Sequence, residues 1–111
     1  MGGFYAPQYK SGVYSEYEPR FAIVSNGKII GGSTYDVDKY NIYNFDVGIL
    51  EEYQGRGMFK KLIDKIISDA KKLNTDGIKA QVINRMLFDY LISIGFKGTN
   101  ESGVKYVYLD F

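Results

Sequence analysis

The feature that most constrains this chain is the stretch of residues 47–73, where an extended apolar run, a glycine loop and an amphipathic segment follow one another. Apolar residues recur at helical spacing from Phe59 onward, which predicts a helix from Met58 to Leu73 with one buried face. Because Gly55 and Gly57 precede it, we expect N–H groups of the loop and of the first helical turn to point outward without partners. The helix dipole favours negative charge at this end, so the stretch predicts a site for a phosphate group.

The rest of the chain supplies strands on either side of this unit. Asn26 and Gly27 separate two β-type runs and suit the positive φ angles of a tight hairpin turn. Asn84 is a good N-cap for a second, shorter helix, which Gly95 ends. The crossover through the long helix makes the third and fourth strands parallel neighbours, so the predicted fold is α/β with a mixed central sheet and two main helices. Strands are predicted at residues 21–25, 28–35, 42–49, 78–83, 96–99 and 104–111, and helices at residues 58–73 and 85–94.

The helical pattern also assigns individual side chains. Leu73 and Ile94 are placed on the buried faces of the two helices, whereas Asp69 is placed with the charged residues on the solvent face. Gly48, near the end of the third strand, marks either a β-bulge or a place where a ligand approaches the backbone.

Two residue types are absent, and each absence excludes a kind of chemistry. Without histidine there is no Ser-His-Asp catalysis and no histidine metal site. Without cysteine there are no disulfides, no thiolate metal sites and no cysteine nucleophile. An enzyme with this sequence must take a carboxylate, a tyrosine, a lysine or water as its base, and we expect no metal.

Length and charge give the remaining bounds. The 111 residues suit one domain, predicted at residues 21–111 behind an aromatic-rich arm of residues 1–20. Acidic and basic residues are mixed, with a net charge of +1, and no basic stripe indicates a nucleic-acid partner. No apolar run is long enough for a membrane span and no signal-peptide pattern is present, so a cytoplasmic protein is expected.

At this point the residues resemble a known family. Residues 54–59 are similar to the coenzyme A pyrophosphate loop of the GCN5-related N-acetyltransferases (GNAT), which reads Gln/Arg-x-x-Gly-x-Gly/Ala. Ile49 and Tyr53 suit the aliphatic and aromatic positions that precede this loop in the family. Asn84 and the Gly-Phe pair at residues 95–96 match a second family feature, at the expected separation. The order of elements matches over the whole predicted domain.

The resemblance implies an N-acetyltransferase that passes an acetyl group from acetyl-CoA directly to an amine acceptor. Acetyl-CoA would lie in a cleft between two splayed parallel strands, with its pantetheine along the strand backbone and its pyrophosphate on the loop N–H groups. A backbone N–H at the expected bulge would polarise the thioester carbonyl. The residues thereby assigned to the cofactor are Val47, Ile49, Gln54, Gly55, Arg56, Gly57, Met58, Phe59, Lys60 and Asn84.

Two candidates for proton transfer follow. Asp46 is the carboxylate nearest the reactive end of the expected cleft and is the candidate general base. The family often places a tyrosine acid for the leaving thiolate four residues before the Gly-Phe glycine, where this chain has Leu91. Tyr90, one residue away, is the candidate acid. Phe59 also departs from the family's Gly or Ala and starts the apolar stripe of the helix.

Several alternatives remain open at this stage. The family usually has two helices before the hairpin, and here only about twenty residues precede Phe21. The acceptor site is therefore open, covered by the arm, or completed by a second subunit, and a homodimer is expected on area grounds. The first rival function is a degenerate CoA- or protein-binding module that acts through partner contacts. The second is an acyltransferase whose acceptor is a lysine of a partner protein rather than a small molecule.

Overall fold

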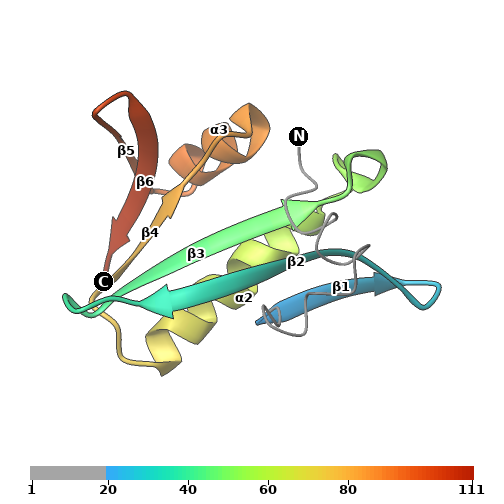
Figure 1. Ribbon diagram of the computed structural model, residues 1–111, viewed down its shortest axis with the longest axis horizontal. Coiled ribbons are helices and arrows are strands. Elements are labelled where there is room, and N and C mark those ends of the chain that lie inside the picture. Colours follow the sequence, from blue (N-terminus) through green and yellow to red (C-terminus); the bar gives the residue numbers. More distant parts are fainter. Residues whose placement is uncertain (1–19) are drawn as a thin grey trace.

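A six-stranded mixed sheet is the framework of residues 20–111, the part of the 111-residue chain that this computed structural model describes (Figure 1). The order across the sheet is β1-β2-β3-β4-β6-β5, in which only β3 and β4 run parallel. The long helix connects these two strands, so the predicted α/β fold with a parallel central pair is confirmed. The elements are β1 (Phe21–Ser25), β2 (Lys28–Val37), β3 (Ile42–Ile49), the short 3-10 helix η2 (Glu51–Tyr53), α2 (Met58–Lys72), β4 (Gly77–Gln81), α3 (Arg85–Ser93), β5 (Lys97–Glu101) and β6 (Val104–Asp110).

The central parallel pair is held together at one end only. Residues 42–44 of β3 pair with residues 77–79 of β4. Beyond Asn44, β3 stays paired with β2 as far as Ile49, while β4 stays paired with β6 as far as Gln81. The two strands diverge from this junction, as Figure 1 shows. The sheet therefore opens along the part of β3 that leads to the glycine loop.

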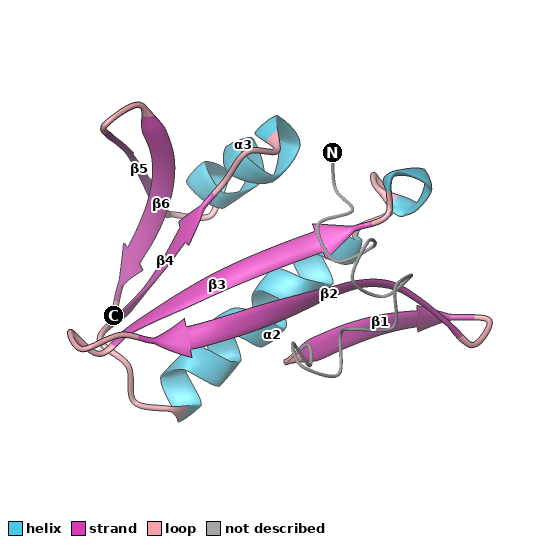
Figure 2. Cartoon of the chain, in the orientation of Figure 1, coloured by secondary structure: helices cyan, strands magenta, loops and turns pink. Residues whose placement is uncertain are grey.

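One hydrophobic core joins both helices to the same face of the sheet (Figure 2). Since strand residues alternate between faces, Asp46 and Gln81 lie on the opposite face, which none of the helices in residues 20–111 covers. The core consists of Tyr43, Phe45, Ile63, Ile66, Ala70, Ile78, Ala80, Val82, Leu87, Leu91, Phe96 and Val107.

Asp69 corrects the sequence prediction, because it is buried against the sheet and not on the solvent face of α2. Only 6% of it is exposed. Its carboxylate accepts hydrogen bonds from Arg20 Nε (2.9 Å) and Nη2 (2.7 Å) and from the hydroxyl of Tyr43 (2.8 Å). Tyr43 is fully buried, so its hydroxyl depends on this acceptor. A charged residue can occupy a buried helical position when its partners come from elements distant in sequence, and the helical period does not reveal these.

Helix ends account for two further corrections. Leu73 and Ile94 were assigned to buried faces, yet they are 41% and 40% exposed. Leu73 is the C-cap of α2 and Ile94 the C-cap of α3, so both lie where the chain turns away from the core. In the strands, β2 extends two residues past the predicted end, and β4 stops at Gln81, two residues earlier than predicted. The 3-10 helix η2 was not predicted.

The β-bulge predicted at Gly48 is wrong. The pairing of β3 with β2 is continuous from Ile49 to Tyr43, and the irregularity in the hairpin lies in β1, between Ile23 and Val24. The backbone of Gly48 instead lies close to that of Gly31 in β2. A Cβ added to Gly31 would lie 2.8 Å from the Gly48 carbonyl oxygen, so position 31 requires a glycine.

The predicted aromatic arm, residues 1–20, lies outside the described residues except for Arg20. Arg20 is integrated with the domain, because its N–H donates to the carbonyl of Ser33 and its guanidinium binds Asp69. Within the described part of the chain, neither helix has the length and apolar character that crossing a membrane requires.

Candidate active site

The edge of β3 that faces the opening has backbone groups available for a ligand. The Leu50 N–H donates to the carbonyl of Ile30 in β2. Because N–H and C=O groups alternate in direction along an antiparallel ladder, those of Phe45, Val47 and Ile49 point away from β2. No pairing with β4 reaches beyond Asn44, so this edge resembles an exposed strand edge that an extended amide chain can pair with.

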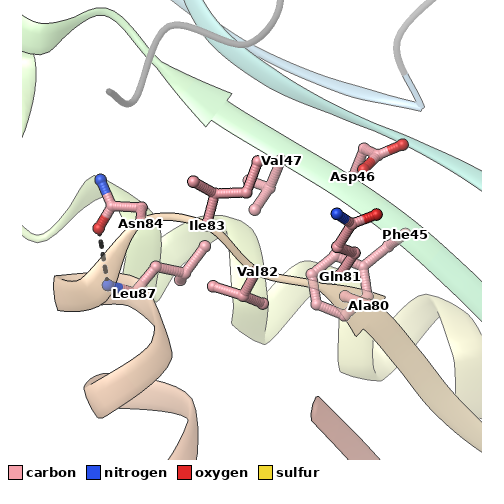
Figure 3. Close-up of a pocket in the computed structure, with 9 residues that line it drawn as sticks. All are labelled: Phe45, Asp46, Val47, Ala80, Gln81, Val82, Ile83, Asn84 and Leu87. Atoms are coloured by element: carbon pink, nitrogen blue, oxygen red, sulfur yellow. Dashed lines mark hydrogen bonds between the residues drawn. The ribbon is translucent and has the colours of Figure 1, made fainter. Parts of the chain in front are cut away.

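A cleft of about 190 Å³ occupies the opening between β3 and β4 (Figure 3). Its floor is apolar, and its polar side chains are those of Asp46, Gln81 and Asn84. The cleft is thus a narrow, mainly apolar slot with few polar groups, which is typical of a ligand site. It is lined by Phe45, Asp46, Val47, Ala80, Gln81, Val82, Ile83, Asn84 and Leu87.

The glycine loop and the start of α2 border a second, adjoining cavity. Gly55 and Gly57 both have positive φ angles (77° and 78°), and an added Cβ at either position would meet nothing within 4 Å. Gly57 is the N-cap of the 15-residue α2, and the first helical turn contains no acidic residue. The loop backbone is therefore open to an anion at the positive end of the helix dipole. This cavity is lined by Ile49, Tyr53, Gln54, Gly55, Gly57, Met58, Phe59, Lys60, Met86, Leu87 and Tyr90.

The two cations of the loop differ in position. Lys60 lines the loop cavity. Arg56 does not, and its guanidinium lies 5.3 Å from the centre of the Tyr53 ring. Phe59 lines the cavity and also packs against the core, so its departure from the family pattern is explained by packing.

Gln54 connects the loop to the end of β3 and to the N-cap of α3. Its Nε2 donates to the carbonyl oxygen of Ile49 (3.0 Å), and its Oε1 accepts a long hydrogen bond from Asn84 Nδ2 (3.5 Å). Asn84 in turn caps α3 by accepting from the Leu87 N–H (2.9 Å). The two sequence motifs are thus in contact, and the Gln54 side chain interacts with protein groups at the end of the cleft.

We predict that Asn84→Ser separates these two roles of Asn84. Serine retains the N-cap but loses the donor to Gln54, so the free energy of unfolding should change by less than about 0.5 kcal/mol. Affinity for acetyl-CoA, the ligand that the family resemblance implies, should fall about 3- to 10-fold, the cost of one neutral hydrogen bond. Titration calorimetry measures the second effect. Asn100→Ser is the matched control, because Asn100 accepts from Gly103 N–H in the β5–β6 turn. If Asn84→Ser and Asn100→Ser bound acetyl-CoA equally well, the hydrogen bond between Asn84 and Gln54 would have no role in binding.

The structure does not bring the two proton-transfer candidates together. Asp46 lines the cleft, whereas Tyr90 lines the loop cavity beside Gly57 and Lys60. Desolvation by surrounding atoms raises the pKa of Asp46 above its ordinary value. Desolvation, together with the charge of Asp64, raises the pKa of Tyr90. Leu91, at the position of the family's tyrosine, is fully buried in the core.

Several residues that line the two cavities were not predicted, among them Gln81, Met86 and Ile83. Gln81 belongs to the cleft, Met86 to the loop cavity, and Ile83 borders the cleft while being 88% exposed. Gln81 could have been found, because it breaks an otherwise apolar strand end next to the splay. Within residues 20–111, no group of side chains suitable for holding a metal ion was found.

A mixed sheet whose central parallel strands splay beside a glycine loop and a helix N-terminus defines the class of acyl-CoA-dependent acyltransferase folds. The family model of the acetyltransferase (GNAT) family matches residues 4–87, and the chain belongs to this family. No curated protein is similar enough in sequence to match the chain.

Solved structures support the same fold at low sequence identity. An N-acetyltransferase from Staphylococcus aureus Mu50 superposes with a TM-score of 0.72 and 13% identity, covering 91% of this chain and 73% of its own. An acetyltransferase from Bacillus subtilis in complex with CoA superposes with a TM-score of 0.71 and 19% identity, covering 90% of this chain and 83% of its own. The protein yncA from Salmonella typhimurium, solved with acetyl-CoA, superposes with a TM-score of 0.69 and 18% identity, covering 80% of this chain and 62% of its own. The present chain thus spans less than two thirds of the last relative.

Proposed function

We propose that this protein is an N-acetyltransferase that transfers an acetyl group from acetyl-CoA directly to an amine acceptor. The observation that carries the proposal is the edge of β3 that β4 leaves beyond Asn44 within residues 20–111, which runs along the cleft and ends at an open glycine loop. The strand edge suits the amides of an extended chain, and the loop suits a pyrophosphate. Family membership supports acyl transfer in general.

The residues of this chain would divide the work as follows. The backbone groups of Val47 and the N–H of Ile49 pair with the pantetheine amides, because the Ile49 carbonyl already accepts from Gln54. The N–H groups of the loop and of the first turn of α2 bind the pyrophosphate. Lys60 adds a cation at that end. Asp46, next to the junction of β3 and β4, accepts the proton of the attacking amine. Bound acetyl-CoA supplies an activated thioester, so the chain needs no nucleophile of its own.

A binding experiment separates this proposal from the rival module. Thermal-shift and calorimetric titration with acetyl-CoA should show stabilisation, and CoA release with a panel of amines should show turnover. The fully buried Leu91 in place of a tyrosine acid is the observation that favours a degenerate module. Binding of CoA without transfer to any amine or to any partner-protein lysine would support the module. No stabilisation by millimolar acetyl-CoA would exclude both functions of the cleft.

We predict that Asp46→Asn lowers turnover about 100-fold, the usual range for losing a general base, without a change in acetyl-CoA affinity. Since desolvation raises the pKa of Asp46, the wild-type rate should fall as the pH drops through that raised value and protonates the carboxylate. The variant should lack this acid limb. Pre-steady-state and steady-state rates measured across pH test both effects, and an unchanged turnover would remove Asp46 as the base.

A further inference from the structure

Gln81 and Asp46 face each other across the cleft from two different strands. Both side chains lie on the sheet face opposite the helical core, because their neighbours Phe45, Val47 and Ala80 belong to the core or pack against it. Figure 3 shows the Gln81 amide extending toward the side of the cleft where the Asp46 carboxylate lies. No helix within residues 20–111 covers this face.

Asp46 and Gln81 also lie at the end of the cleft where the reactive group of a bound cofactor is expected. The loop that would bind the pyrophosphate lies at the far end of β3, beyond Ile49. A chain that pairs with Ile49 and then Val47 arrives next at Asp46, close to the last pairing of β3 with β4. The reactive end of the cleft is thus bordered by one carboxylate and one amide.

We propose that Gln81 is a specificity-determining residue of this transfer. It accepts one N–H group of a primary amine while Asp46 accepts the other, and it thereby discriminates against N-alkylated amines. The inference rests on the proposed acetyl transfer. A neutral primary amine has two N–H groups and one lone pair. With both N–H groups bound by oxygens on opposite walls, the lone pair is directed at the thioester carbon. A secondary amine of the same chain length would place an alkyl group against the Gln81 oxygen, which would lose its donor.

The step is balanced without any further reactant. The nitrogen lone pair forms the new C–N bond, and the C–S bond breaks with its electron pair leaving on sulfur. Asp46 takes the proton released by nitrogen, and the thiolate of CoA takes up a proton from Asp46 or from water. The products are an N-acetylated amine and CoA with a free thiol.

The test compares a primary alkylamine with its N-methyl derivative as acceptors. The wild-type protein should prefer the primary amine by about 10-fold or more in kcat/KM, and Gln81→Leu should reduce that ratio toward 1. Affinity for acetyl-CoA and melting temperature should stay unchanged in Gln81→Leu. Thr99→Val is the matched control, because Thr99 lies in β5 on the same face of the sheet, one strand beyond β6. The control should keep the wild-type ratio.

A second variant tests the proximity of the pair without relying on turnover. Gln81→Glu keeps an acceptor oxygen but places a second carboxylate opposite Asp46, so the pKa of Asp46 measured by carboxyl NMR should rise. Other charged side chains on this face are Asp36 of β2, Lys79 of β4, which binds Glu101 of β5, Lys97 of β5 and Asp110 of β6, and the variant leaves these unchanged. If the pKa of Asp46 did not move in Gln81→Glu, the proposed role of Gln81 would be wrong. The same holds if an active Gln81→Leu protein kept the wild-type selectivity ratio. Neither result would contradict the proposed acetyl transfer. Wild-type protein that binds acetyl-CoA but acetylates neither amine nor any other amine would overturn the proposed function as well.

Discussion

Gly57→Glu should abolish detectable binding of acetyl-CoA. The new side chain would add bulk and a negative charge at the N-cap of α2, where the loop cavity is expected to receive a pyrophosphate. Replacing a charge-assisted attraction by repulsion should weaken binding at least about 100-fold, or about 2.7 kcal/mol. Titration calorimetry of wild-type protein and variant at equal concentrations measures the effect.

The strain of a side chain at positive φ must be separated from the loss of the anion site. Gly27 provides the control, because its φ angle is 76° against 78° for Gly57, and an added Cβ would meet nothing within 4 Å at either position. Gly27→Glu should therefore lose the same stability, about 1–2 kcal/mol, while binding acetyl-CoA as the wild type does. If Gly57→Glu bound acetyl-CoA as tightly as Gly27→Glu, the loop assignment would be wrong.

Asp69→Ala should give the largest loss of stability among single changes at polar residues described above. The change leaves the fully buried Tyr43 hydroxyl without its acceptor and removes both hydrogen bonds of Arg20. Arg20 can be hydrated because its side chain is 38% exposed, so we expect about 2–3 kcal/mol, mainly from Tyr43 and the lost pairing. The melting temperature should fall by about 10–20 °C.

Two further variants separate the role of the buried Asp69 from a general effect of removing a carboxylate. Asp64→Ala changes an exposed carboxylate on the same helix and should alter stability by less than about 0.5 kcal/mol. Adding Tyr43→Phe to Asp69→Ala should restore part of the loss, since the unpaired buried hydroxyl is then removed. No restoration would show that the hydroxyl is not the origin of the effect.

The same ion pair has a defined pH dependence. Hydrogen bonds from Arg20 lower the pKa of Asp69 below its ordinary value of 3.8. A depressed folded-state pKa stabilises the fold above the unfolded-state value, and the stabilisation is lost as the pH falls through the folded-state value. The stability difference between wild type and Asp69→Ala should therefore shrink in denaturant titrations below about pH 4.

Local patterns were sufficient for much of the fold. The Asn26-Gly27 turn, the apolar stripe of α2 and the cap at Asn84 are each local in sequence, and each is present in the structure. The predictions for Leu73 and Ile94 failed because both residues are helix C-caps, whereas the prediction for Asp69 failed because of contacts distant in sequence. Asp69 is buried because Arg20 and Tyr43 reach it, and no helical period contains that information.

The site shows the same division. The glycine loop could be located because it needs residues of one type at fixed spacing, whereas the partner of Gln54 could not be predicted, since thirty positions separate it from Asn84. Gln81 interrupts an apolar strand end and could have been noticed, but its place opposite Asp46 follows from the divergence of β4 from β3, which spacing along the chain does not give. The separation of Asp46 and Tyr90 into two cavities likewise depends on where α3 packs, which spacing along the chain does not give.

The three-residue junction of β3 and β4 has a consequence for how the domain transmits force. The sheet consists of two antiparallel blocks, β1-β2-β3 and β4-β6-β5, that share few backbone hydrogen bonds and are joined otherwise by side-chain packing beneath. The two blocks are therefore connected by three paired positions at one end and by the shared core on one face. A chain that pairs with β3 and also packs against the β4 residues of the cleft would contact both blocks, so its binding would stabilise their relative position.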